Sequence, residues 1–503
     1  MFLEYLKEHK LEWLIQPPKP KKILPRNAHA VYLKVMKAMQ NGEKIWIEPD
    51  CDPDGFFSAK SWQYTFDKLG YKRYQIGVLS SRKHKVSKAK MMDVLAQGFT
   101  TIILVDSSTN EVDLIDAICN YRTPDGKEVQ LLILDHHNGK YTWDRYPENC
   151  TLVNPKLEPE HLPYYEVSAG VVNAMVCDYI LFRNGYQRNR ELDIFGYLTM
   201  YSDNCAVADP YISGYMRTTL GNNTDIPAIL QVFWDDYSSM NRNFISFKVV
   251  PLINALIRMN RFDMVDQLFF HTHEIADKNL FINQIKTIKQ ESVEAVDYLM
   301  SIMEVNNIAD TMVIGLLPSN LEQKYYNFLG FVAMRLAEKY KKVALCLYLD
   351  MNTDMYVGSA RDYLNRDILS EFTTFFEESA GHDSAFGVVI EKSKLHIVPE
   401  IISQASLDVK QDYIDFKFAD LTSSKEIYYM AIYNEMAINK IPKARLVIPI
   451  TGDFTLGGST KRATATNKDI TIVSFGTPIE RCHEYVCEPS FNGGRVECII
   501  QSK

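Results

Sequence analysis

Apolar runs separated by helix-length segments are the feature of this 503-residue chain that most restricts its fold. The strand-like runs are residues 45–47, 74–79, 101–105 and 131–134. Stretches long enough for helices, such as 58–69 and 112–121, lie between them. Strands that alternate with helices are typical of a parallel sheet with crossover connections. We therefore predict an α/β fold built on a parallel sheet.

Acidic and imidazole side chains follow three of these runs. The segments are Asp50-Cys51-Asp52-Pro53-Asp54-Gly55, Asp106 and Asp135-His136-His137. Ligands of open parallel sheets gather beyond the carboxyl ends of the strands, so these side chains are expected to converge. Asp203 is a further candidate, although by itself it reads as an ordinary helix or loop acid. Asp106 alone also reads as an ordinary strand-terminating residue.

Such a set of side chains suits the hydrolysis of a phosphodiester, in which both the attacking and the leaving oxygen need charge stabilisation. Two divalent ions about 3.5–4 Å apart provide it. Mixed carboxylate and imidazole ligands favour Mn²⁺ or Mg²⁺, and the lack of a paired thiolate set argues against structural zinc. A calcium loop is the alternative for residues 50–55, but no Glu occupies the twelfth position and an apolar strand precedes the loop.

Two other motifs keep two interpretations each. Cys482, His483, Cys487 and Cys498 resemble a zinc cluster, but their spacing fits no standard pattern and buried reduced thiols are the simpler reading. Residues 457–462 are rich in Gly and basic side chains, which suggests either a phosphate cradle or a basic hairpin loop. The P-loop spacing is missing, which favours the hairpin.

In their order along the chain, the motifs at Asp50–Gly55, Asp106, Asp135-His136-His137 and Asp203 resemble those of the DHH phosphoesterases. Further segments resemble the RecJ-like branch of single-strand-specific exonucleases: 153–155, 168–170 and 247–258. Segments 358–361 and 380–387 resemble the associated DHHA1 domain. Four residues depart from the family pattern: Leu252, Ile257, Ala380 and Phe386. The resemblance covers residues 44–395.

The resemblance implies roles for the residues of the site. Two Mn²⁺ or Mg²⁺ ions would be held by Asp50, Asp52, Asp54, Asp106, His136 and Asp203. Asp135 would orient an imidazole, and His137 would donate to the scissile phosphate or act as a general acid. Asp135, His136 and His137 are therefore the catalytic candidates.

Substrate contacts are expected from basic clusters, because the net charge of the whole chain is −8. The resemblance implies that the run Arg82, Lys83, His84 and Lys85 lies at the mouth of the metal site; a solvated helix face is the alternative. From the RecJ-like and DHHA1-like segments we add Asn254, Arg258, Ser359, Arg361, Gly381 and His382, which would grip the nucleic-acid strand. A tight turn with a capping His is the plainer reading of the last two.

Five segments are predicted. They are a leader (1–43), a DHH catalytic domain (44–224), a helical connector (225–308), a second α/β domain of DHHA1 type (309–398) and a small β-rich C-terminal domain (399–503). A channel between the two α/β domains would admit a single strand and exclude a duplex. No run of eighteen apolar residues occurs, and scattered cysteines indicate reduced thiols, so a cytoplasmic protein without membrane contact is expected.

The sequence thus predicts a two-metal exonuclease that degrades single-stranded DNA to mononucleotides in DNA repair or recombination, with 5′-to-3′ polarity implied by resemblance alone. A monomer is expected, with a single-strand-binding protein or a helicase as candidate partners. Short oligoribonucleotides, cyclic dinucleotides or a nucleotide bisphosphate are alternative substrates, since relatives with the same motifs hydrolyse them. A non-catalytic replication scaffold is the alternative from another class.

Overall fold

The structure is a computed structural model, and it divides the chain into two compact units. The first comprises Met1–Ile253, Val265–Lys278 and Tyr413–Lys503, and the second Asn254–Met264 and Asn279–Asp412. The described residues are all except 17–23, 80–84, 159–165, 188, 206–211, 213–215, 217–225, 236–237, 307–309, 365, 373–374, 383, 405–412, 438–440, 460–461, 476, 493–494 and 503.

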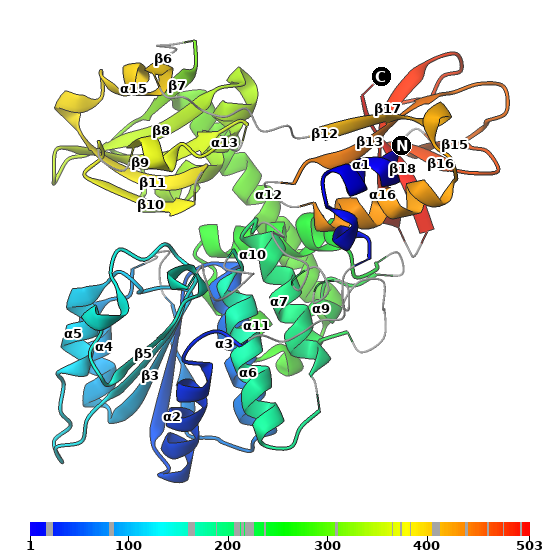
Figure 1. The fold of residues 1–503 in the computed structure, drawn as a ribbon. Helices are drawn as coiled ribbons and strands as arrows, with labels where there is room; N and C mark the ends of the chain where they lie inside the picture. The colour runs from blue at the N-terminus through cyan, green and yellow to red at the C-terminus, as the bar shows by residue number, and fades with distance from the viewer. Residues whose placement is uncertain are drawn as a thin grey trace. The chain divides into compact units, whose positions relative to one another are not determined.

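The first unit contains a five-stranded parallel sheet (Figure 1). Its strand order is β2-β1-β3-β4-β5. The strands are β1 (Lys44–Pro49), β2 (Tyr74–Ile76), β3 (Phe99–Val105), β4 (Gln130–Leu134) and β5 (Cys150–Val153). All seven residues of β3 are buried, as expected of a central parallel strand with both faces covered. The carboxyl ends of β1, β3 and β4 consequently meet at one edge.

Helices cover both faces of this sheet. On one face, α4 (Lys88–Ala96) and α5 (Val112–Cys119) pack into a core with Ile102, Leu104 and Leu131. On the other lie α3 (Pro53–Lys68), α6 (Ala169–Arg183) and α7 (Arg190–Ser202), which pack against one another. Figure 1 shows α4 and α5 on the opposite side of the sheet from α3 and α6. Helix α2 (Ala28–Gln40) precedes β1.

The middle of the chain is largely helical. Its elements are α9 (Ala228–Gln231), the π-helical η4 (Phe244–Val249), α10 (Val250–Arg258), α11 (Phe262–Phe270) and α12 (Lys278–Ile302). The second unit then forms a six-stranded mixed sheet, β10-β11-β9-β8-β7-β6. Its strands are β6 (Glu304–Asn306), β7 (Met312–Leu317), β8 (Val343–Asp350), β9 (Met355–Asp362), β10 (Glu378–His382) and β11 (Ala385–Glu391). Helices α13 (Leu329–Tyr340), α14 (Leu369–Phe372) and α15 (Val398–Gln404) pack on this sheet.

The end of the chain forms a seven-stranded sheet, β12-β13-β17-β18-β16-β15-β14. Its elements are β12 (Tyr413–Lys417), α16 (Lys425–Met436), β13 (Lys443–Pro449), β14 (Thr455–Gly458), β15 (Arg462–Thr466), β16 (Thr471–Phe475), β17 (Glu484–Asn492) and β18 (Arg495–Ser502). The first helix, α1 (Phe2–Glu8), packs on α16, where the Phe2 amide donates to Glu426 Oε2 at 3.0 Å. The N-terminal helix is thereby anchored to the C-terminal sheet.

The predicted fold class is confirmed by these three sheets and their helices. Three local differences stand out. Strand β2 ends at Ile76 although the apolar run extends to 79, β5 was not predicted, and α16 adds a helix to the expected β-rich end. Of the segment 457–462, Gly457 and Gly458 pair with Thr464 and Ala463 in the antiparallel β14–β15 hairpin, and residues 460–461 lie outside the described residues. The five segment boundaries remain predictions. None of the helices in the described part of the chain is long and apolar enough to cross a membrane.

Candidate metal centre

The turn between β1 and α3 carries the first three acids. Asp52 is the N-cap of α3, and its Oδ1 accepts from the Gly55 amide at 3.0 Å. Asp50 and Asp54 are buried, with exposures of 6% and 1%. A side-chain carbon at Gly55 would lie 2.6 Å from the backbone nitrogen and oxygen of Asp50, so only glycine lets the helix start this close to the strand end.

Both carboxylate oxygens of Asp54 bind the start of another helix. Oδ2 accepts from the Ala169 amide at 2.9 Å and Oδ1 from the Gly170 amide at 2.6 Å. These amides are at the N-terminus of α6, where unpaired N–H groups and the helix dipole favour an anion. Asp54 therefore joins the β1–α3 turn to α6.

Asp106 follows β3 in an unusual backbone conformation. Its φ is +61°, in the left-handed region that non-glycine residues rarely adopt, while its amide continues the sheet by donating to Leu134 O at 3.0 Å. Strained backbone of this kind concentrates at functional sites. The conformation keeps the carboxylate of Asp106 inside, at 2% exposure.

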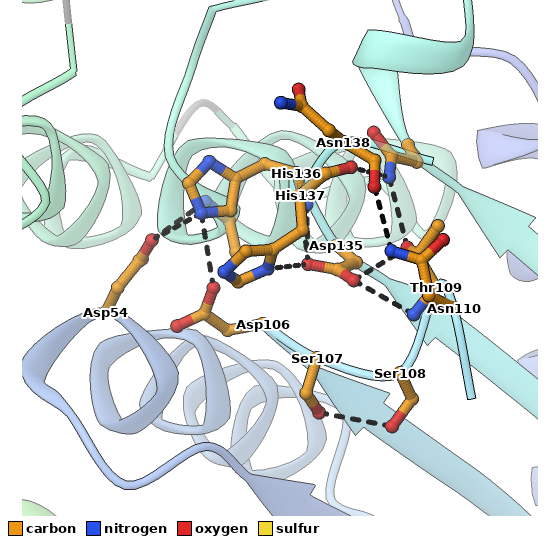
Figure 2. Close-up of polar contacts among 12 residues, drawn as sticks. Asp54, Asp106, Ser107, Ser108, Thr109, Asn110, Asp135, His136, His137 and Asn138 are labelled. Atoms are coloured by element: carbon orange, nitrogen blue, oxygen red, sulfur yellow. Dashed lines mark hydrogen bonds and ion pairs between the residues drawn. The ribbon is translucent and has the colours of Figure 1, made fainter. Parts of the chain in front are cut away.

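Asp135 is completely buried and serves as a hydrogen-bond acceptor for the two histidines and for Thr109 (Figure 2). Its Oδ1 accepts from the His136 amide at 2.7 Å and from His137 Nδ1 at 2.8 Å. Its Oδ2 accepts from the Thr109 amide at 3.1 Å and the Thr109 hydroxyl at 2.6 Å. Because these bonds occupy both oxygens, Asp135 orients its neighbours.

When the ring of His136 is neutral, its proton is on Nδ1. Nδ1 lies 2.9 Å from the Val167 carbonyl oxygen, which can only accept, so Nδ1 carries the proton. Nε2 then presents its lone pair to carboxylates, at 3.4 Å from Asp106 Oδ1 and 3.3 Å from Asp203 Oδ2. A backbone carbonyl that fixes the far nitrogen in this way is the usual second partner of a metal-binding imidazole.

Asp203 comes from the C-cap of α7, on the other side of the cluster. Its Oδ2 accepts a hydrogen bond from Cys205 Sγ at 3.3 Å. Burial and the neighbouring Asp203 and Asp54 carboxylates raise the pKa of the Cys205 thiol well above its usual value, which keeps that thiol protonated as a donor. Helix α7 is positioned against α6 by the 2.8 Å bond between the Ser168 and Thr199 hydroxyls.

Three overlapping groups of side chains could each hold a metal ion. They are Asp50, Asp52 and Asp106; Asp106, His136 and His137; and His136, Asp203 and Cys205, with the ligand atoms of each group within 4.8 Å of one another. Asp106 belongs to two groups and His136 to two. Figure 2 shows Asp54 and Asp106 converging on His136. Shared ligands of this kind are what two neighbouring cations need.

The carboxylates are held at a cost in free energy. Burial, followed by the charges of Asp203 and Asp52, raises the pKa of Asp54 well above its usual value. Burial and the charge of Asp54 do the same to the pKa of Asp106. Acids held so close together repel one another unless protons or cations compensate. A bound cation would relieve this repulsion.

The Asp135–His137 pair has the opposite character. Burial alone lowers the pKa of His137, but the charge and hydrogen bond of Asp135 raise it to about 9. Burial would raise the pKa of Asp135, yet the charge and hydrogen bond of His137 hold it below its usual range. Asp135 is therefore an ionised partner for a positively charged His137.

Of the predicted basic run, Arg82, Lys83 and His84 lie outside the described residues. Lys85 is exposed, and its charge lowers the pKa of Glu111, which burial raises on balance. Glu111 in turn is close enough to Asp50 and Asp135 for their charges to act on it. Lys85 thus lies near Glu111, whose carboxyl group is also near two acids of the site.

The other predicted substrate residues, Asn254, Arg258, Ser359, Arg361, Gly381 and His382, belong to the second unit. Arg361 Nη1 donates to Ser359 Oγ at 2.7 Å, and Ser359 Oγ donates to Phe386 O at 3.1 Å. Gly381 has φ +142°, and a side chain there would lie 2.7 Å from Ala385 O. Asn254 and Arg258 lie half-buried on α10. The side chain of His382 lies outside the described residues.

Four contributors were not predicted from sequence: Thr109, Asn154, Val167 and Cys205. Asn154 Nδ2 donates to Thr109 Oγ1 at 3.0 Å and to His137 O at 2.9 Å, which connects the loops after β3, β4 and β5. Asn154 lies in the Asn-Pro segment of the resemblance, so a signal existed for it. Thr109, Val167 and Cys205 are single residues outside any motif, so nothing in the sequence pointed to their roles. The cysteines near 482–498 form no metal group among the described residues.

The chain resembles known proteins in sequence and in fold. No family model matches the chain. The chain is 22% identical over 414 residues to the single-stranded-DNA-specific exonuclease RecJ of Bacillus subtilis, with 78% of this chain and 50% of that protein covered. The chain therefore spans about half the length of this curated relative.

Solved RecJ structures share the fold. The Mn²⁺ complex of RecJ from Thermus thermophilus superposes with a TM-score of 0.72 at 12% identity, covering 99% of this chain and 74% of that one. The Mg²⁺ complex of the same protein gives 0.64 at 12% identity, with 99% and 73% covered. A manganese-bound exonuclease RecJ gives 0.56 at 13% identity, with 76% and 94% covered. The resemblance to the RecJ-like DHH phosphoesterases is therefore confirmed, in sequence by the curated relative and in fold by the solved structures.

Proposed function

We propose that the chain is a divalent-metal-dependent exonuclease that hydrolyses single-stranded DNA to mononucleotides, with 5′-to-3′ polarity. The observation that carries the proposal is the convergence of Asp54, Asp106 and Asp203 on His136 at one edge of the parallel sheet, with Asp50 and Asp52 grouped beside Asp106. The curated relative is a single-stranded-DNA-specific exonuclease, and related structures contain Mn²⁺ or Mg²⁺, which supports the choice of substrate and ions.

The residues present fit a pair of divalent ions. Asp106 Oδ1 is buried and has no hydrogen-bond partner among the described residues, as suits an oxygen that binds a cation. In the proposal the two ions would be held by Asp50, Asp52, Asp54, Asp106, His136 and Asp203. When bound, such ions supply Lewis-acid activation of water and neutralise charge on the phosphodiester.

The remaining residues position groups around the reaction. Asp135 holds the His137 ring through Nδ1 and stabilises positive charge on it, so that Nε2–H is available as a hydrogen-bond donor to a phosphate oxygen. The Val167 carbonyl accepts a hydrogen bond from the His136 ring, and the Asp135 carboxylate accepts one from the His136 amide, so both ends of this residue are held. Thr109 and Asn154 hold Asp135 and the His137 carbonyl in turn.

The test is cleavage of 5′- and 3′-labelled DNA and RNA strands by the full chain in Mn²⁺, Mg²⁺ or EDTA, with a dinucleotide as a parallel substrate. Release of mononucleotides from the 5′ end of single-stranded DNA, absent in EDTA and in the Asp106→Asn variant, is expected. Preferred hydrolysis of the dinucleotide, or of RNA, would move the protein to the alternative substrates. No metal-dependent cleavage of any substrate would overturn the proposal and favour a scaffold.

A further inference from the structure

One sulfur atom lies among the carboxylates and the imidazole of the candidate metal centre. Cys205 Sγ is 3.3 Å from Asp203 Oδ2, and the same oxygen is 3.3 Å from His136 Nε2. One ligand atom from each of these three residues lies within 4.8 Å of the other two. Cys205 is not among the residues proposed above to hold the two ions, yet its side chain contacts one of them.

The end of helix α7 places the sulfur there. Asp203 is the C-cap of α7, and Asn204 follows it with φ +52°, in the left-handed region that commonly ends a helix. The Asn204 amide then donates to Tyr201 O at 3.3 Å and the Cys205 amide to Met200 O at 3.0 Å, which are the two bonds of a Schellman motif. The backbone of this turn thereby holds the side chains of positions 203 and 205 in contact.

The spacing of these ligand atoms suits a tetrahedral ion. Zn²⁺ binds sulfur at about 2.3 Å and nitrogen or oxygen at about 2.0–2.2 Å, and at tetrahedral angles these lengths place neighbouring ligand atoms about 3.3–3.7 Å apart. The two separations of 3.3 Å around Asp203 Oδ2 agree with that spacing. Asp106 Oδ1 offers a further oxygen, since it is 3.4 Å from His136 Nε2 and has no hydrogen-bond partner among the described residues.

Sulfur changes which ion the position prefers. Carboxylates, carbonyls and waters suit Mg²⁺ and Mn²⁺, whereas a cysteine ligand selects thiophilic ions such as Zn²⁺. A divalent ion binds cysteine as the thiolate, so it would replace the proton that Cys205 donates to Asp203 and release that proton to solvent. Cys205 is partly exposed, which leaves the sulfur accessible to an ion.

We propose that Cys205 is a further ligand of the metal centre and, together with His136 and Asp203, makes one ion position selective for thiophilic divalent ions such as Zn²⁺ and Cd²⁺. The inference rests on the proposed function for the existence of the ion position, and it goes beyond that function in the sulfur ligand and in the class of ion. Sites of nitrogen and oxygen ligands already bind Zn²⁺ more tightly than Mn²⁺. The measure of the sulfur is therefore how much of this preference depends on Cys205.

The experiment adds one equivalent of Cd²⁺ to the metal-free full chain, because a bond between Cd²⁺ and a thiolate gives a charge-transfer band in the ultraviolet. The Cys205→Ser variant keeps a hydroxyl that can donate to Asp203 and removes only the sulfur. Cys482→Ser is the matched control, since Cys482 is an exposed cysteine outside the metal groups of the described residues. Calorimetry gives the affinities of the same three proteins for Zn²⁺ and Mn²⁺, and thermal unfolding checks that each protein is folded.

The charge-transfer band is expected in the wild type and in Cys482→Ser and is expected to be absent in Cys205→Ser. The Zn²⁺ affinity of Cys205→Ser should fall by at least about tenfold, because the loss of a residue that only orients a ligand already costs about 10- to 100-fold. Its Mn²⁺ affinity should fall by a smaller factor, since Mn²⁺ is bound chiefly through oxygen ligands.

A band of wild-type strength in Cys205→Ser, no band in the wild type, or an equal loss of Zn²⁺ and Mn²⁺ affinity in the variant would each overturn the inference. Should Cys205→Ser not fold, the wild type carries the test. Bound Cd²⁺ should then protect Cys205 from alkylation by iodoacetamide, read from peptide masses, and unchanged alkylation would overturn the inference. Failure of the proposed function is recognised separately as the absence of Mn²⁺-dependent cleavage by the wild type, whereas the band and the affinities are measured without nucleic acid.

Discussion

Replacing Asp135 by Asn tests whether this buried carboxylate orients the site rather than binding metal. The amide has nearly the same volume, so it can keep Oδ1 as the acceptor for the His136 amide and for His137 Nδ1. The new NH₂ group then faces the Thr109 amide, which is also a donor and at present lies 3.1 Å from Oδ2. Two donors are left face to face in a buried position.

The magnitude follows from these contacts. A buried donor left without an acceptor costs about 1–3 kcal/mol, and a hydrogen bond to a charged group contributes about 1.5–3 kcal/mol. Removing the buried charge offsets part of this, so the free energy of unfolding should fall by about 1–4 kcal/mol at pH 7. Loss of a residue that orients metal ligands reduces activity about 10- to 100-fold. The Asp135→Asn variant should therefore fold and retain weak Mn²⁺-dependent cleavage.

The assay combines denaturant unfolding in EDTA with single-turnover cleavage in Mn²⁺. Thr109→Ser is the matched control, since it keeps the hydroxyl that donates to Asp135 at 2.6 Å and should leave both measurements close to those of the wild type. Unchanged stability and turnover in Asp135→Asn would refute the orienting role. Complete loss of Mn²⁺ binding would show instead that Asp135 is a direct ligand.

Three further predictions concern Asp106, Gly55 and Glu435. Asn tolerates the left-handed backbone at position 106, and Asp106→Asn should raise the melting temperature in EDTA because it removes one of the mutually repelling acids. The variant should also lose the increase in melting temperature that Mn²⁺ is expected to give the wild type. A Mn²⁺-induced increase as large as that of the wild type would contradict the assignment of Asp106 as a ligand. Gly55→Ala should destabilise the first unit and lower its affinity for Mn²⁺, because the added carbon would lie 2.6 Å from backbone atoms of Asp50. Calorimetric titration with Mn²⁺ measures the affinity, and an unaltered value would show that the turn can relax. Burial raises the pKa of Glu435 from 4.5 to about 7, so between these pH values the native state holds a proton that the unfolded state has lost. The free energy of unfolding should therefore fall by about 3 kcal/mol as the pH rises through that range. Glu435→Gln should flatten this part of the plot of unfolding free energy against pH, and an unchanged slope would count against the prediction.

The strands and their terminal acids could be predicted because both signals are local. Apolar runs such as 101–105 and 131–134 are typical of buried strands. A parallel arrangement of these strands brings the acids after them to one edge of the sheet. The same motif includes Gly55, and only glycine fits there because helix α3 starts against the backbone of Asp50. The order of the motifs along the chain then added Asp203, which its local surroundings alone would not have singled out.

Contacts between distant positions were decided by the tertiary structure. The proton on His136 Nδ1 is fixed by a carbonyl 31 residues away, and Thr109 reaches Asp135 across 26 residues, with no spacing in the sequence to announce either. The packing of α1 on α16 joins Phe2 to Glu426 across 424 residues.

Periodicity and motifs in the sequence therefore determined which elements form and which acids follow them, because these depend on near neighbours along the chain. Which hydrogen-bond partner each acid and imidazole receives, and where like charges gather, was decided only when packing brought remote segments together, because desolvation and Coulomb energies depend on distances in space.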